Sequence, residues 1–105
     1  MATFSRKISS RQLPDGSRGR RKYTKDYAGI LERAEILSDA KVTSSDVNTL
    51  SVDTVSYDGS TVSFWAECQA EVDDRLVPLD VLITGNSGTE ETFEEFIQVV
   101  DVLRA

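Results

Sequence analysis

The chain has 105 residues, 39% of them hydrophobic and 29% charged, with a formal net charge of −6, one cysteine and no histidine. This length predicts one domain with at most a tail, and no stretch approaches the 18 consecutive apolar residues of a membrane span. The missing histidine excludes Ser-His and Cys-His catalytic pairs and His-containing metal sites, while a single Cys68 excludes an internal disulfide and multi-cysteine zinc sites.

The first 26 residues carry most of the positive charge. They contain eight cations and two acids, a net charge of +6, whereas residues 27–105 contain four cations and sixteen acids, a net charge of −12. The eight cations are Arg6, Lys7, Arg11, Arg18, Arg20, Arg21, Lys22 and Lys25. This asymmetry predicts a basic N-terminal arm, residues 1–26, attached to an acidic body, residues 27–105, and a partner that carries negative charge.

The arm has few apolar residues, and they are scattered among Ser, Arg, Lys and Gly. Such a segment cannot bury enough surface to offset the entropy cost of ordering it alone. Pro14-Asp15-Gly16 is a turn signal, because proline presets φ and glycine accepts a positive φ. We expect two extended pieces joined by this turn, with Phe4, Ile8 and Leu13 as anchors in a neighbour's groove. The alternative is a solvated, disordered tail.

Short apolar runs between turn signals recur along residues 27–105 at intervals typical of an all-β sandwich. Tyr27–Leu31 fits a first strand or a linking turn. The next strand is predicted to place four residues on one face, namely Ile36, Ser38, Ala40 and Val42. Leu50–Tyr57 is rich in β-branched residues, and its apolar phase changes between Val52 and Val55, which indicates a bulge.

Asp58-Gly59 predicts a hairpin, because a type I′ turn needs a positive φ at both central positions. In the strand that follows, Thr61–Glu67, the apolar residues Val62, Phe64 and Ala66 alternate with others and predict the buried face. Trp65 then faces outward, where an exposed tryptophan is suited to binding a partner. The alternative is that Trp65 faces the core.

Leu76–Thr84 is a further predicted strand, with its buried face formed by Val77, Leu79, Val81 and Ile83. Pro78 on the other face lacks an N–H donor, which indicates an edge position there. Gly85-Asn86-Ser87-Gly88 is a strong turn signal. The last segment, Thr89–Arg104, fits both a helix, from the spacing of its apolar residues, and a strand, from its Phe, Ile and Val content.

The body resembles small structural proteins of the tailed-phage virion, of the fiber–tail adaptor or head–tail neck type. The resemblance covers residues 26–103 and rests on Asp26-Tyr27, Leu31-Glu32-Arg33-Ala34-Glu35-Ile36, Val42, Leu50-Ser51-Val52, Val62-Ser63-Phe64-Trp65-Ala66 and Val81-Leu82-Ile83-Thr84. It departs from the family pattern at Ala34, where glycine is usual, and at Glu67–Glu71, which replaces a glycine-rich turn. The basic arm also lies outside the pattern.

The resemblance implies an immunoglobulin-like β-sandwich and a terminal strand in place of a helix. It also implies several copies in a ring or lattice that holds other virion proteins together. The implied location is the virion, assembled in the host cytoplasm, which agrees with a single unpaired cysteine. The implied partners are connector, tail, fibre or capsid proteins.

The sequence contains no catalytic motif, so we expect a protein that is not an enzyme and holds no metal or cofactor. The hypothesis is an adaptor whose eight arm cations, with Phe4, Ile8 and Trp65, bind neighbouring subunits. One alternative is a capsid decoration (cement) protein. A second is a nucleic-acid-binding module that uses the arm, which the acidic body opposes by repelling phosphates.

Overall fold

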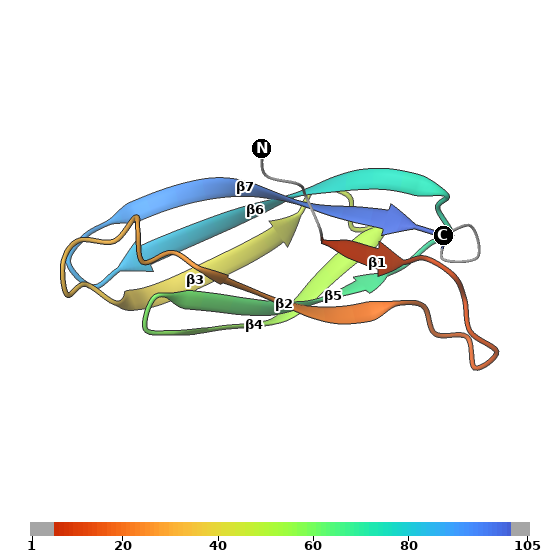
Figure 1. The fold of residues 1–105 in the computed structure, drawn as a ribbon, viewed down its shortest axis with the longest axis horizontal. Coiled ribbons are helices and arrows are strands. Elements are labelled where there is room, and N and C mark those ends of the chain that lie inside the picture. Colours follow the sequence, from red (N-terminus) through yellow and green to blue (C-terminus); the bar gives the residue numbers. More distant parts are fainter. Residues whose placement is uncertain (1–5, 102–105) are drawn as a thin grey trace.

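The computed structural model describes residues 6–101. Within that range every regular element is a strand: β1 Lys7–Ser9, β2 Arg20–Asp26, β3 Leu37–Ser44, β4 Leu50–Asp58, β5 Thr61–Cys68, β6 Asp74–Gly85 and β7 Glu90–Val100. They form a four-stranded sheet in the order β1-β7-β6-β3 and a three-stranded sheet in the order β2-β5-β4 (Figure 1). The prediction of an all-β fold with sandwich-like layers is confirmed.

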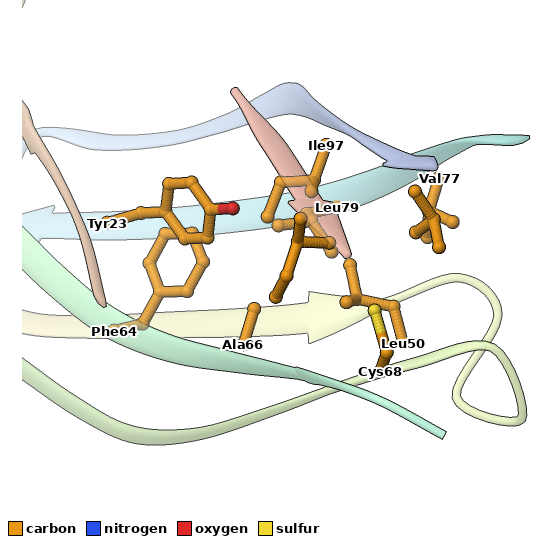
Figure 2. Close-up of a cluster of buried hydrophobic side chains, with 10 residues drawn as sticks. Tyr23, Leu50, Phe64, Ala66, Cys68, Val77, Leu79 and Ile97 are labelled. Carbon is orange, nitrogen blue, oxygen red and sulfur yellow. The ribbon is translucent and has the colours of Figure 1, made fainter. Parts of the chain in front are cut away.

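The core lies between the sheets, where side chains from both layers point toward one another (Figure 2). The predicted inward residues are buried, namely Val77, Leu79, Val81 and Ile83 in β6, and Val62, Phe64 and Ala66, joined by Cys68, in β5. Successive side chains of a strand point to opposite faces, so a period of two identifies the buried face. Both alternation predictions are confirmed.

The last segment forms β7, so the strand alternative is confirmed as far as Val100. β7 pairs with β6 without interruption, from Thr84 opposite Glu90 to Asp74 opposite Val100. Ile97 and Val99 are fully buried, which gives the period of two expected for a strand. The helical spacing was misleading because the outer face of β7 also carries apolar residues.

The segment predicted as an arm supplies β1 and β2, one strand to each sheet. β1 runs parallel to the end of β7, and β2 pairs with β5 along its whole length. Ile8 of β1 is 4% exposed and Tyr23 of β2 is 8% exposed, and both belong to the core. Residue 26 is therefore the end of a strand. Residues 6–26 contribute to both sheets and do not form a separate arm.

β4 contains an irregularity where the apolar phase changes. Its register with β5 shifts between Asp53 and Ser56, and Thr54 inside the shift has a left-handed φ of 54°. The predicted bulge is confirmed. It lets both Val52 and Val55 pack against the core, although they are an odd number of positions apart.

The residues before β3 differ in part from the prediction. Tyr27–Leu31 forms the turn alternative, in which Ile30 N–H donates to the Tyr27 carbonyl at 3.0 Å. The register of β3 with β6 shifts between Leu37 and Asp39. Because of this shift Leu37 is buried and Ile36 is 51% exposed, so Ile36 does not share the inward face of the strand.

The hairpin predicted at Asp58-Gly59 is present, with a different turn type. Asp58 pairs with Thr61, so the two loop residues are Gly59 and Ser60. Gly59 has a φ of 62°, and Ser60 has no positive φ, which is the pattern of a type II′ turn. The turn predicted at 85–88 is also present, and Gly85 N–H donates to the Thr89 carbonyl at 2.7 Å.

Pro78 lies in an internal strand, because β6 pairs with both β7 and β3. The edge prediction is wrong for the strand as a whole. The β3 ladder ends at Ser44 opposite Leu79, and Ser45 N–H donates to the Pro78 carbonyl at 3.1 Å. The missing N–H of Pro78 therefore faces Ser45, just beyond the last paired residue of β3, so proline removes only a bond at the end of this ladder.

Candidate functional site: a basic edge

The site is built where β1 and the start of β2 approach each other from the two sheets (Figure 1). Ser10 N–H donates to the Val100 carbonyl at 2.8 Å, and Gly19 N–H donates to the Ser9 carbonyl at 3.0 Å. A Cβ atom on Gly19 would overlap the Ser9 backbone, so only glycine allows this approach. We call the surface formed by residues 6–25 the basic edge.

The Lys7 carbonyl joins the two sheets at this edge. It accepts hydrogen bonds from the Tyr23 hydroxyl at 2.9 Å and from the Arg21 guanidinium at 3.0 Å. Burial raises the pKa of Tyr23 to about 12, still further above neutral pH, where the hydroxyl is protonated and donates. The outward carbonyls of β1 at Lys7 and Ser9 are thus both occupied, which protects this short edge strand.

Glu95 lies on the inward face of β7, opposite β2. Its carboxylate accepts from Arg6 at 2.6 Å and from Lys25 at 3.0 Å, and its side chain is only 13% exposed. Burial raises the pKa of Glu95, but the hydrogen bonds from Arg6 and Lys25 outweigh it, and the net pKa is lowered. Two cations of the predicted arm are therefore bound by an acid of their own chain.

Arg20 lies on the outer face of the three-stranded sheet. It donates two parallel hydrogen bonds to Asp53, both at 2.8 Å, and contacts Glu67 at 3.2 Å. The Arg20 hydrogen bond is the main reason why the pKa of Asp53 is lowered to about 2. The guanidinium also lies 5.0 Å from the centre of the Trp65 ring. Trp65 therefore takes the outward alternative, half-buried beneath Arg20.

The predicted binding residues divide into three groups. Arg6, Arg18, Arg20, Arg21 and Lys25 all donate to groups of their own chain. Lys7 and Lys22 are exposed, and Arg11 is half-buried; within residues 6–101 the side chains of these three form no hydrogen bond or ion pair. Ile8 is buried in its own core, so it is not an anchor for a neighbour's groove, and Phe4 lies outside the described residues.

A cavity of about 350 Å³ lies at the basic edge, between β1 and β2. Its lining combines apolar atoms with three cations, from Lys7, Ile8, Ser9, Gly19, Arg20, Arg21 and Val100. Sequence reasoning identified the cations but missed Ser9, Gly19 and Val100. A glycine between Arg18 and Arg20 was the one local signal of a close backbone approach.

The described part of the chain was also examined for metal-ligating clusters and for a reactive cysteine. No group of three or more Cys, Asp or Glu side chains between residues 6 and 101 is arranged to hold a metal ion. Cys68 is buried, which raises the pKa of its thiol to about 11 and makes it a poor nucleophile. No helix among the described residues is long and apolar enough to span a membrane.

The chain was also compared with known proteins. No protein-family model matches it, and no curated protein matches it.

Proposed function

We propose that the chain is a non-enzymatic structural protein of the tailed-phage virion, an adaptor that joins tail, neck or fibre components through its basic edge. The observation that carries this proposal is the gathering of cations around the cavity between β1 and β2, on a chain that is otherwise acidic. A surface of this kind suits an acidic partner, and several copies in a ring or lattice would present it repeatedly.

The strand order supports an immunoglobulin-like sandwich. In that fold strands B, E and D are neighbours in one sheet, and C, F and G are neighbours in the other. Here β2-β5-β4 and β3-β6-β7 follow the same order along the chain. β1 pairs with β7, the counterpart of strand G, so the first strand lies across from β2 and helps to form the basic edge.

The basic edge replaces the free arm as the docking element. Individual exposed ion pairs contribute roughly 0–1 kcal/mol, so binding would depend on several contacts in repeated copies. Removing residues 1–26 would also remove Ile8 and Tyr23 from the core, and would unfold the protein instead of isolating its binding role. Point substitutions of exposed cations are the informative test.

A mass-spectrometric copy count of purified particles tests the proposal. We expect the chain in particles, at about a dozen copies or fewer if it forms a neck or tail ring. The Lys22→Glu variant should be incorporated less than the wild type. Lys41→Glu changes an exposed lysine of β3, the edge strand farthest from β1 in the four-stranded sheet, and this variant should be incorporated normally. Absence of the wild-type chain from particles would refute the proposal.

Two alternatives predict different results, one in the copy count and one in a gel-shift experiment. A capsid decoration protein would be present in hundreds of copies per particle. A nucleic-acid-binding module would shift DNA or RNA in a gel at low salt and lose binding steeply as salt rises. The exposed side chains of Lys7 and Lys22 favour the second alternative, whereas the net charge of −6 opposes it.

A further inference from the structure

We propose that the basic edge binds an extended acidic segment of a partner protein as an additional strand beside β2, in which carboxylates and apolar side chains alternate. This inference rests on the proposed adaptor function and adds to it the mode of binding and the sequence pattern of the partner. Three features of the described residues carry it, namely the free backbone groups of β2, the outward cations and the cavity.

The backbone of β2 has an open side. Tyr27 N–H donates to the Ser60 carbonyl, and the Gly19 carbonyl accepts from Cys68, so the odd-numbered residues of β2 bond to β5. In an antiparallel pair the bonded positions alternate, so the backbone groups of Arg20, Lys22 and Thr24 point away from β5. Among residues 6–101 no strand pairs with that side. An extended segment would find there the donors and acceptors needed for strand addition.

Two of the outward side chains of the open strand are basic. Arg20 and Lys22 lie on the outer face, because Tyr23 between Lys22 and Thr24 points into the core. Residues opposite each other in adjacent strands share a face, so outward side chains of an added strand would lie beside these two cations. Lys22 has no ion-pair partner among the described residues, and Arg20 remains 40% exposed. Outward carboxylates are therefore favoured, and outward lysines or arginines are repelled.

The inward side chains of the added strand would meet the cavity. Arg21 is an inward residue of β2, and it lines the 350 Å³ cavity together with Ile8 and Val100. A cavity of this volume is within the range of small-molecule pockets, so it can receive one or two apolar side chains. The cationic groups at its margin disfavour basic inward residues. Because most of the exposed lining of the cavity is apolar, the inward positions favour apolar residues, which gives the alternating pattern.

Two other occupants fit less well. A second β2 would place like charges side by side, which destabilises strand pairing. The acidic strand β7 of a second copy offers Glu90, Glu91 and Glu94, but its inward Phe93 packs against Tyr27 with ring centres 5.3 Å apart. Phe93 would have to leave its own core to enter the cavity. The occupant is therefore a segment of a different protein.

The test uses a blocked peptide, acetyl-Glu-Leu-Glu-Val-Glu-Leu-Glu-amide, titrated into the full chain at low and moderate salt. Trp65 is the single tryptophan and lies under Arg20, so its fluorescence reports on this edge. Amide chemical shifts should change in β1, β2 and residues around Gly19, and not in β3. We expect affinity to fall with salt, because the outward pairs are exposed to screening.

Matched peptides separate the three features. A peptide of the same composition with all Glu residues first should bind at least about tenfold more weakly, because only alternation serves both faces. Alternate backbone nitrogens of the peptide can be methylated at either the odd or the even positions. Only one of these two sets of N–H groups faces β2, so one methylated peptide should lose binding and the other should keep it. Replacing Leu and Val by Ser tests the cavity and should also weaken binding about tenfold.

Matched protein variants test the cations. Lys22→Glu should weaken peptide binding about fivefold or more, as expected for one lost pair and one new repulsion. Lys41→Glu, which makes the same charge change outside the basic edge, should change affinity less than twofold. Both side chains are exposed and lack ion pairs in residues 6–101, so both variants should remain folded, which unfolding curves verify.

Several outcomes would overturn the inference. Equal binding of the alternating and the segregated peptide would show charge attraction without strand addition. Binding of a single-stranded oligonucleotide but not of the peptide would assign the edge to nucleic acid. Concentration-dependent self-association that Lys22→Glu removes would assign it to a second copy. A failed peptide experiment with a normal copy count in particles would reject this mode of binding and leave the adaptor function standing.

Discussion

The hydroxyl of Tyr23 donates a hydrogen bond to the backbone carbonyl of Lys7 at 2.9 Å, and this bond links the three-stranded sheet to the four-stranded sheet at the basic edge. The Tyr23 ring packs against Phe64, with ring centres 5.7 Å apart. One residue of a highly charged strand thus anchors that strand in the core and positions β1. The basic edge depends on this anchor for its shape.

Tyr23→Phe should lower the free energy of unfolding by about 0.5–1.5 kcal/mol, because it removes the hydroxyl and keeps the ring in the core. The Lys7 carbonyl keeps its bond from Arg21, which limits the loss. Urea unfolding followed by Trp65 fluorescence measures the change. Tyr57→Phe removes an exposed hydroxyl bonded to the Ser38 carbonyl, and should cost less. A larger loss for Tyr57→Phe would contradict the anchoring role of Tyr23.

Glu35→Gln should lower the free energy of unfolding at neutral pH and make it depend less on pH in the acidic range. The carboxylate accepts from the Thr89 hydroxyl and from the backbone of Glu32, Ser87 and Thr89, and these bonds lower its pKa from 4.5 to about 2. Because the pKa of Glu35 is lower in the folded protein, its carboxylate contributes fully to the free energy of unfolding above about pH 4.5. This contribution is lost as the pH falls toward 2.

Unfolding curves between pH 2 and pH 7 test this linkage. The stability difference between wild type and Glu35→Gln should be largest at pH 7 and should shrink below pH 4.5. Glu32→Gln changes an exposed carboxylate in the same turn and serves as the control, with little effect expected. A difference between wild type and Glu35→Gln that is constant with pH would contradict the role of the charge.

Gly85→Ala should destabilise the fold by about 1–3 kcal/mol, as is typical of overpacking. A Cβ atom at this position would overlap the Glu35 carboxylate, which would have to move away from its hydrogen bonds. Gly29→Ala is the matched control, because a Cβ atom there would meet nothing within 4 Å and Gly29 has no positive φ. Thermal unfolding distinguishes the two, and similar losses in both variants would count against this explanation.

Thr54→Asn should raise the free energy of unfolding by about 1 kcal/mol. Thr54 has a φ of 54°, a conformation that is unfavourable for a β-branched residue and more accessible to asparagine. Thr43→Asn, on the regular strand β3, should instead be neutral or slightly destabilising. Chemical denaturation compares them, and a loss of stability in Thr54→Asn would show that its side-chain bond to Asp53 matters more than its backbone strain.

Cys68 should resist thiol reagents in the folded protein. Its pKa is raised from 9.0 to about 11 by burial, which lowers the thiolate fraction at pH 8 about a hundredfold, and its side chain is enclosed in the core. Labelling in native buffer should therefore be slow, and labelling in urea should be fast and complete. Rapid native labelling would indicate that the end of β5 opens readily.

The amino-acid sequence by itself determined the inward faces of β5 and β6, the positions of the turns and the bulge of β4. These features depend on neighbouring residues: alternation sets the buried face, and glycine or proline sets the turn. Trp65 took one of its two predicted positions because alternation with Phe64 leaves no other.

The tertiary structure alone decided the role of residues 6–26. β2 has one deeply buried residue, Tyr23, so its composition resembles that of a disordered tail, and its order comes from pairing with β5. Three features depend on residues that local sequence patterns do not connect. They are the close approach of Gly19 to Ser9, the ion pairs of Glu95 with Arg6 and Lys25, and the cavity. Local sequence patterns indicate which segments favour strands and turns. The basic edge and its cavity form only when the ends of the two sheets pack together.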